Sequence, residues 1–198
     1  MKLQARTVRT LVFALAFPVW LYGALSLVLG SGVSRTSMMG VLVGIGMAVP
    51  GCAAAWLAVR PVRIEWFRWP WWSFALLGLG WAVRAWLLAD LQPWPWILAN
   101  LVFYLAAVGI PEEFIFRGCV EDGLSQFGPL RAAIVAGLFF GATHAPLAIL
   151  RGEAPFWAVF NTLGGGVLYH LAMRWLRNKG GLAVPVLVHG LLDFLGAR

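Results

Sequence analysis

Two adjacent glutamates after an apolar stretch are the first residues in this sequence whose type and spacing could support chemistry. Glu112 and Glu113 follow the apolar run 96–110, and Arg117 comes four residues after Glu113. Side chains four residues apart share one face of an α-helix, so Glu113 and Arg117 can form an ion pair. Glu112 points about 100° away from that face and has no partner at helical spacing. An unpaired carboxylate in an apolar segment is suited to act as a general base, and Glu112 is therefore the candidate.

Two histidines in later apolar stretches supply further candidates. His144 follows Phe140 by four residues, which places the imidazole and the aromatic ring on one helical face. His189 precedes Asp193 by the same spacing, so the carboxylate can hold the imidazole in one orientation. Together with Glu112, these groups could activate a water molecule and stabilise an oxyanion. They could also ligate a metal ion such as zinc through Glu112, His144 and His189.

Other special residues of the apolar stretches have structural explanations. We expect Arg84 to extend to the membrane boundary, and His170, near Arg174, to be structural or interfacial. Pro111 either kinks its helix or begins a new helix with the two glutamates at its N-terminus. Three consecutive glycines at 164–166 predict the close approach of a neighbouring helix.

The composition places all these residues in a membrane protein. Hydrophobic residues make up 61% of the 198-residue chain and charged residues 12%, and the mean hydropathy is +0.82. A chain of this size cannot bury so much apolar surface, which excludes a soluble domain, a disordered chain and a coiled coil. The formal net charge of +7 comes from Lys and Arg at the ends of apolar stretches, without the clustering of a nucleic-acid-binding surface. We therefore expect the lipid bilayer, and no nucleic acid, as a partner.

Seven apolar stretches are long enough, or nearly so, to cross a bilayer, which takes about 20 residues. Eleven of the fifteen Lys and Arg residues fall on the side that contains the N-terminus, and three fall on the opposite side. Positive charges mark the cytoplasmic side, so the N-terminus is predicted to be cytoplasmic. The predicted fold is an all-α, polytopic membrane helix bundle with about seven transmembrane helices. Their expected ranges are 10–30, 38–59, 71–89, 96–118, 131–149, 155–173 and 181–196.

Three short motifs combine the candidate residues in the order found in a known family. The motifs are EExxxR at 112–117, FxxxH at 140–144 and HxxxD at 189–193. In this order, on successive apolar helices, they resemble the CPBP family, which contains the CAAX proteases and the bacteriocin-processing, or Abi-type, enzymes. The resemblance covers residues 96–196, which is about half of the chain.

This resemblance implies a glutamic-type intramembrane endopeptidase that uses no cofactor and no metal. Glu112 would act with His144 to activate the attacking water, and His189 with Asp193 would stabilise the tetrahedral oxyanion. The aspartate departs from the eukaryotic CAAX enzymes, which have Asn at this position, and an ionised aspartate cannot donate a hydrogen bond. The supporting residues would be Glu113, Arg117 and Phe140.

The expected partner is a membrane-anchored protein or peptide that is cleaved near its anchored terminus. That terminus would be a C-terminal sorting tail, a leader peptide or a CAAX-like end. The expected location is a bacterial cytoplasmic (inner) membrane, in which the chain forms one integral domain, 1–198, with N-terminal helices in 1–95 and the catalytic core in 96–196. Two alternatives stay open: a zinc metalloprotease built on the same residues, and a non-enzymatic immunity or transport protein whose buried charges form a proton or substrate path.

Overall fold

In the part of the chain that the structure describes, seven helices form a bundle and lie where the sequence predicts seven apolar stretches. Among the residues described by the computed structural model there is no β-strand. These residues are 4–30, 37–61, 64–89, 91–150 and 152–196. The helices are α1 (Ala5–Gly30), α2 (Met38–Val59), α3 (Trp71–Leu88), a central helix of consecutive segments (Trp94–Gly123), α7 (Pro129–Leu150), α8 (Pro155–Gly180) and α9 (Ala183–Leu195).

The central helix continues through Pro111, so the expectation that a new helix could begin there is wrong. A proline lacks the backbone N–H and crowds the preceding turn, which an ordinary α-helix tolerates poorly. Here the turns on both sides of Pro111 are widened into π-helix, a geometry often found at functional sites. The segments are α4 (Trp94–Val102), η1 (Phe103–Gly109), α5 (Ile110–Glu112), η2 (Glu113–Val120) and α6 (Glu121–Gly123), and the short 3₁₀ turn η3 (Ser125–Phe127) follows.

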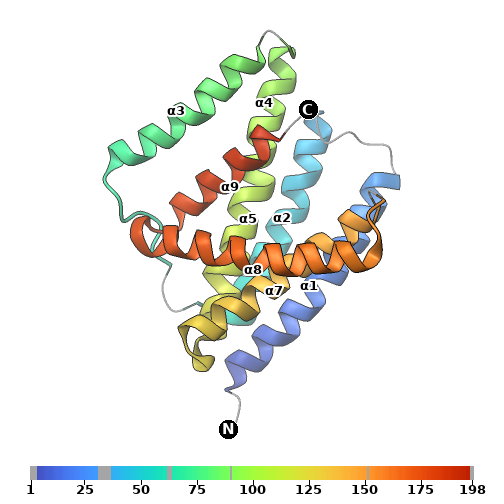
Figure 1. Ribbon diagram of the computed structural model, residues 1–198, viewed down its shortest axis with the longest axis vertical. Helices are drawn as coiled ribbons and strands as arrows, with labels where there is room; N and C mark the ends of the chain where they lie inside the picture. Colours follow the sequence, from blue (N-terminus) through green and yellow to red (C-terminus); the bar gives the residue numbers. More distant parts are fainter. Residues whose placement is uncertain (1–3, 31–36, 62–63, 90, 151, 197–198) are drawn as a thin grey trace.

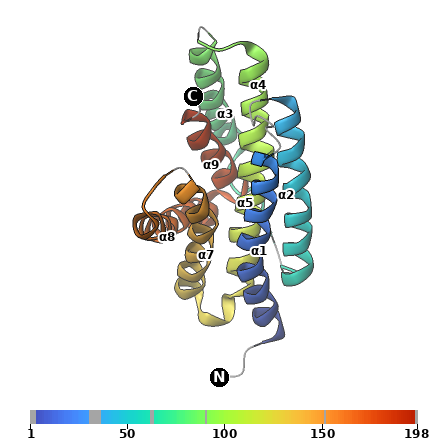
Figure 2. The same cartoon turned by 90° about the vertical axis from the view of Figure 1, so that its right-hand side faces the viewer.

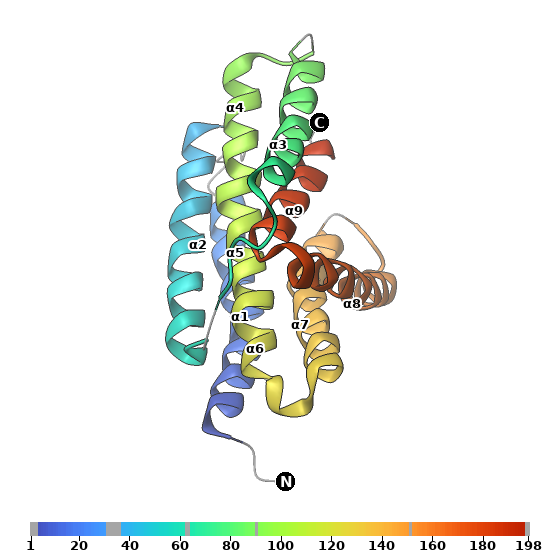
Figure 3. The same cartoon turned by 90° about the vertical axis from the view of Figure 1, so that its left-hand side faces the viewer.

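The helices are not all aligned with one another. Figure 1 shows α2 beside the central helix along the length of the molecule, with α8 running across them, and α8 is seen nearly end on in Figures 2 and 3. The largest buried apolar cluster joins α1, α2, the central helix and α7, and a second one joins α3, the central helix and α9. The first cluster packs against residues 115–120 of the central helix and the second against residues 97–104.

Within the described part of the chain, α2, α3 and the central helix are long and apolar enough to cross a membrane, and α9 is apolar but shorter. The number of crossings and the cytoplasmic N-terminus stay predictions. Helix α8 includes the predicted span 155–173, but it is not one of these three candidates. It also runs across α2 and the central helix rather than alongside them.

Helices α7 and α8 pack at very close range through glycines. A Cβ added to Gly166 would lie 2.6 Å from the Cα of Gly141 and 2.8 Å from the carbonyl oxygen of Gly137. A Cβ added to Gly164 or Gly165 would meet no atom within 4 Å. The predicted close approach at the glycine triplet is therefore confirmed for Gly166, and the other two glycines do not take part in it.

Helix α9 is fastened between the central helix and α3. A Cβ on Gly109 would lie 2.9 Å from the carbonyl oxygen of Val186, so the backbones of α9 and the central helix nearly touch. From α3, Arg84 Nη2 donates to the carbonyl oxygen of Leu195 at 3.0 Å. Arg84 therefore satisfies the end of α9, and its extension to the membrane boundary stays a prediction.

Replacing Gly166 with Ala should destabilise the fold, because the new methyl group would collide with the α7 backbone rather than with a movable side chain. Overpacking of this kind costs about 1–3 kcal/mol. We expect a lower thermal unfolding temperature in detergent for Gly166→Ala, measured by tryptophan fluorescence. The matched control is Gly165→Ala on the same helix, which should unfold at or above the wild-type temperature. Equal effects of the two substitutions would contradict the packing assignment.

Candidate active site

A buried group of three charged or polar side chains lies between the central helix and α9. Glu113 Oε1 is 2.6 Å from Arg117 Nη1 and 2.8 Å from His189 Nδ1. The Glu113 and Arg117 side chains have no exposed surface, and His189 is 5% exposed. A carboxylate paired with a guanidinium can only accept hydrogen bonds, so His189 Nδ1 is the donor. The predicted Glu113–Arg117 pair is confirmed, and the fold adds His189 to it.

Two aromatic rings cover the guanidinium of this group. The Arg117 Cζ atom lies 5.1 Å from the Phe140 ring centroid and 5.3 Å from the Tyr169 ring centroid. The two rings stack on each other with centroids 5.5 Å apart, and the Tyr169 ring also meets His189 edge to face at 5.2 Å. Cation–π contacts stabilise a guanidinium that has lost its water. Phe140 of α7 and Tyr169 of α8 therefore form the apolar wall of the site.

Glu112 lies at the edge of this group and faces both candidate histidines. Its Oε2 atom is 3.7 Å from His144 Nε2 and 3.7 Å from His189 Nε2, and it makes no hydrogen bond to a described residue. The side chain is 24% exposed, in contrast to the fully buried Glu113 beside it. Residues from α5, α7 and α9, which are far apart in the sequence, thus meet at one carboxylate oxygen.

The His144 imidazole is held by its own helix. Its Nδ1 atom is 2.9 Å from the carbonyl oxygen of Phe140 and 3.0 Å from Thr143 Oγ1. A carbonyl oxygen can only accept, so Nδ1 carries a hydrogen, and in the neutral imidazole Nε2 then has the lone pair. This orientation turns the Nε2 lone pair toward Glu112, on a side chain that is 40% exposed.

Asp193 takes a different position from the one its spacing suggests. Its Oδ2 atom lies 3.6 Å from His189 Nε2, beyond hydrogen-bond distance, and the side chain is 41% exposed. The imidazole is instead oriented by Glu113, whose carboxylate holds Nδ1 at 2.8 Å. The hydrogen bond that orients His189 therefore comes from Glu113, and Asp193 makes a longer ion-pair contact with the same imidazole.

A second polar cluster, which the sequence analysis did not identify, lies one turn further along the central helix. Glu121 is 2.9 Å from His170 Nε2 and 2.8 Å from Arg174 Nε. His170 is fully buried, so it is structural rather than interfacial. The spacing of four residues between Arg117 and Glu121 is a signal that could have pointed to this cluster. Tyr169 carries no such signal, because an aromatic residue in an apolar helix is ordinary.

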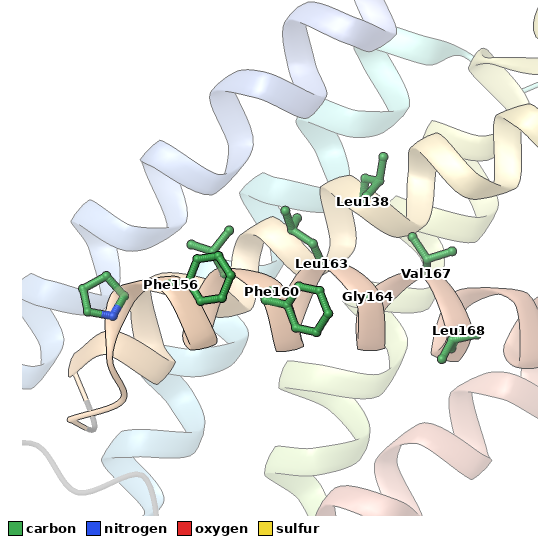
Figure 4. Close-up of a pocket in the computed structure, with 9 residues that line it drawn as sticks. Leu138, Phe156, Phe160, Leu163, Gly164, Val167 and Leu168 are labelled. Carbon is green, nitrogen blue, oxygen red and sulfur yellow. The ribbon is translucent and has the colours of Figure 1, made fainter.

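No group of three or more His, Cys, Asp or Glu side chains among the described residues has the arrangement to hold a metal ion. An apolar groove of about 880 Å³ runs along α8. Figure 4 shows residues that line it, such as Leu138, Phe156, Phe160 and Val167. None of the predicted site residues lines this groove. The candidate chemistry therefore rests on the side chains around Glu112.

Comparison with known proteins places the site within a family. Residues 93–195 match the family described as "Type II CAAX prenyl endopeptidase Rce1-like". This range covers slightly more than half of the chain and contains all seven residues predicted for the site. No curated protein and no solved structure matches the chain.

Substituting the two adjacent glutamates should have very unequal effects on stability. Glu113→Gln leaves the buried Arg117 charge without its counter-charge, and breaking a buried pair costs about 3–5 kcal/mol. We expect this variant to lose most of its folded yield and to unfold at a lower temperature. Glu112→Gln, whose carboxylate is partly exposed, should remain within about 1 kcal/mol of the wild type. Size-exclusion profiles and unfolding temperatures in detergent measure both, and similar losses in the two variants would refute this distinction.

Proposed function

This chain belongs to the Rce1-like family of type II CAAX prenyl endopeptidases, and on that premise we propose that it is a glutamic-type intramembrane endopeptidase with Glu112 as general base. One observation carries the assignment of the base. Glu112 Oε2 lies 3.7 Å from the Nε2 atoms of two imidazoles that come from two other helices. A water molecule and a carbonyl oxygen can be bound between groups arranged in this way.

In the proposed reaction, Glu112 takes a proton from a water molecule whose oxygen bonds to the scissile carbonyl carbon. The carbonyl oxygen becomes an oxyanion in the tetrahedral intermediate. Glu112 then passes the proton to the leaving amine as the carbon–nitrogen bond breaks. The products are a new carboxyl terminus and a new amino terminus, and the carboxylate is restored.

The two histidines have different proposed roles because their Nδ1 atoms have different partners. The backbone carbonyl that holds His144 Nδ1 leaves Nε2 as an acceptor, which suits an imidazole that helps Glu112 to orient the water. Glu113 holds His189 Nδ1, and Nε2 of this imidazole faces Glu112 and Asp193, so an Nε2–H of His189 would donate to the oxyanion. Asp193 would assist His189 in stabilising the oxyanion, from the exposed side of the site.

The proposed substrate is a membrane-anchored protein or peptide that is cut near its anchored terminus. An integral membrane protein with its base on a central helix must meet its substrate in or at the bilayer. Suitable substrates are a C-terminal sorting tail, a leader peptide or a CAAX-like end, and the proposed location is a bacterial cytoplasmic membrane. This substrate class follows from the family and from the position of the site.

Glu112→Gln should abolish cleavage while the protein stays folded, because an amide cannot accept the proton from water. General-base catalysis contributes about 10²–10⁴-fold to rate. The measurement is a quantitative membrane and secreted proteome of host cells that express the wild type or the variant at matched levels. We expect a small set of proteins to keep a terminal segment only in the variant. Glu153→Gln, an exposed carboxylate in the loop before α8, is the matched control and should behave as the wild type.

The proteome comparison, together with a chelator test of the wild type, separates the two alternative functions. If the variant loses a host phenotype without any uncleaved protein accumulating, the non-enzymatic immunity or transport function is favoured. If cleavage is lost on treatment with chelators and restored by zinc, the metalloprotease alternative is favoured. Full cleavage by Glu112→Gln would refute Glu112 as the base.

Asp193→Asn should retain cleavage within about threefold of the wild type, because Asp193 is partly exposed and does not orient His189. The amide also adds an N–H donor that the ionised aspartate lacks. Kinetics on a substrate identified from the proteome comparison provide the measurement. Asp193→Leu, which removes all polar contact, should be slower than both, and a loss above tenfold for Asp193→Asn would show that the carboxylate itself is required.

A further inference from the structure

Every buried side-chain polar atom that lacks a hydrogen bond, in the part of the chain that the structure describes, belongs to one region. The six atoms come from the central helix and α8: Glu112 Oε2, Glu113 Oε2, Arg117 Nε and Nη2, Tyr169 Oη, and His170 Nδ1. A buried polar group without a partner costs about 1–3 kcal/mol. Six such groups would cost an amount comparable to the whole stability of a domain, about 5–15 kcal/mol. Groups of this kind are normally satisfied by internal water.

The residues of these two helices meet where α8 crosses the central helix. On the central helix, Glu113, Arg117 and Glu121 are spaced by four residues and share one face. On α8, Tyr169 meets Arg117 through its ring and the adjacent His170 meets Glu121 through Nε2. Arg117 and Glu121 of the central helix therefore each meet a polar residue of α8, while Glu113 meets His189 of α9. We call this set of residues the polar column; its members are Glu112, Glu113, Arg117, Glu121, Tyr169 and His170.

The end of the polar column away from Glu112 reaches partly exposed side chains. Glu121 Oε1 lies 2.8 Å from Arg174 Nε and 3.9 Å from Arg177 Nη1, and these arginines are 24% and 21% exposed. Arg177 also donates to the carbonyl oxygen of Arg117. It lines a polar recess of about 150 Å³ with Glu65, Arg68 and Asn178. The polar column therefore has one end at the candidate active site and the other near a polar surface.

The chemistry of the six atoms identifies their partner as water. Two glutamate oxygens can only accept, two arginine nitrogens can only donate, and the tyrosine hydroxyl and the histidine Nδ1 can do either. An anion would be repelled by Glu112 and Glu113, and a cation would be repelled by Arg117. Water both donates and accepts and is small enough to reach buried atoms, so it fits the whole set.

We propose that a chain of internal water molecules fills the polar column and supplies the hydrolytic site from the end where Arg174 and Arg177 lie. Each peptide bond that is hydrolysed consumes one water molecule, and the polar column has one end at Glu112. The supply role rests on the proposed endopeptidase function. The presence of water in the column does not.

Hydroxyl-radical footprinting of the wild-type protein in detergent, read by mass spectrometry, tests for the water without any substitution. Radicals formed from internal water oxidise the side chains next to it. His170 has no exposed surface, yet we expect its oxidation rate to be within about fivefold of that of His144, which is 40% exposed. Phe194, which is equally buried in an apolar cluster, should not be oxidised. A His170 as unreactive as Phe194 would overturn the proposal.

Tyr169→Phe tests the supply role, because it keeps the ring contacts with Phe140, Arg117 and His189 and removes only the hydroxyl from the column. Loss of one hydrogen bond to water in the chain should lower kcat about fivefold and leave KM unchanged. The control Tyr22→Phe, on α1, should match the wild type. If His170 is oxidised as expected but Tyr169→Phe keeps full kcat, the supply role is wrong. If the chain cleaves nothing, the endopeptidase function fails instead, while the footprinting still decides whether the column holds water.

Discussion

The rest of the structure depends on the buried pair of Glu113 and Arg117. Two charges without solvent contact cost several kcal/mol each unless they are paired and covered on all sides. The pairing itself is local, because the residues are four apart on one helix. The cover is not local: α7 contributes Phe140, α8 contributes Tyr169 and α9 contributes His189. The pair therefore requires three helices to assemble against the central helix at one level, and the same assembly brings the histidines to Glu112.

This arrangement explains why two adjacent glutamates are needed. Neighbouring residues on a helix point about 100° apart, so only one of them can face the buried arginine. Glu113 is used for structure, and its second hydrogen bond orients His189. Glu112 is left at the edge with a free oxygen between two imidazoles. The widened helical turns around Pro111 lie at this position, where the spacing of the two side chains matters most.

The close contact between α7 and α8 gives the site its second polar layer. Glycines let the two backbones approach, so Tyr169 and His170 of α8 reach the face of the central helix that carries Arg117 and Glu121. Hydrolysis among apolar helices requires groups that hold water as well as groups that activate it. The fold places polar side chains at successive turns for the first purpose and gathers Glu112 with two histidines for the second.

The sequence by itself determined the helical class, the seven apolar segments, the Glu113–Arg117 pair and the membership of Glu112, His144 and His189 in one site. The first three depend on composition and on spacings within one helix, which are local properties, whereas the grouping of Glu112, His144 and His189 was implied by the resemblance of three ordered motifs to a known family. Only the tertiary structure decided that Glu113 rather than Asp193 orients His189, that Arg84 satisfies the end of α9, and that Tyr169, His170 and Glu121 form a second polar layer. These contacts join residues about 50 to 110 positions apart, and no spacing along one helix encodes which helices meet or at what level.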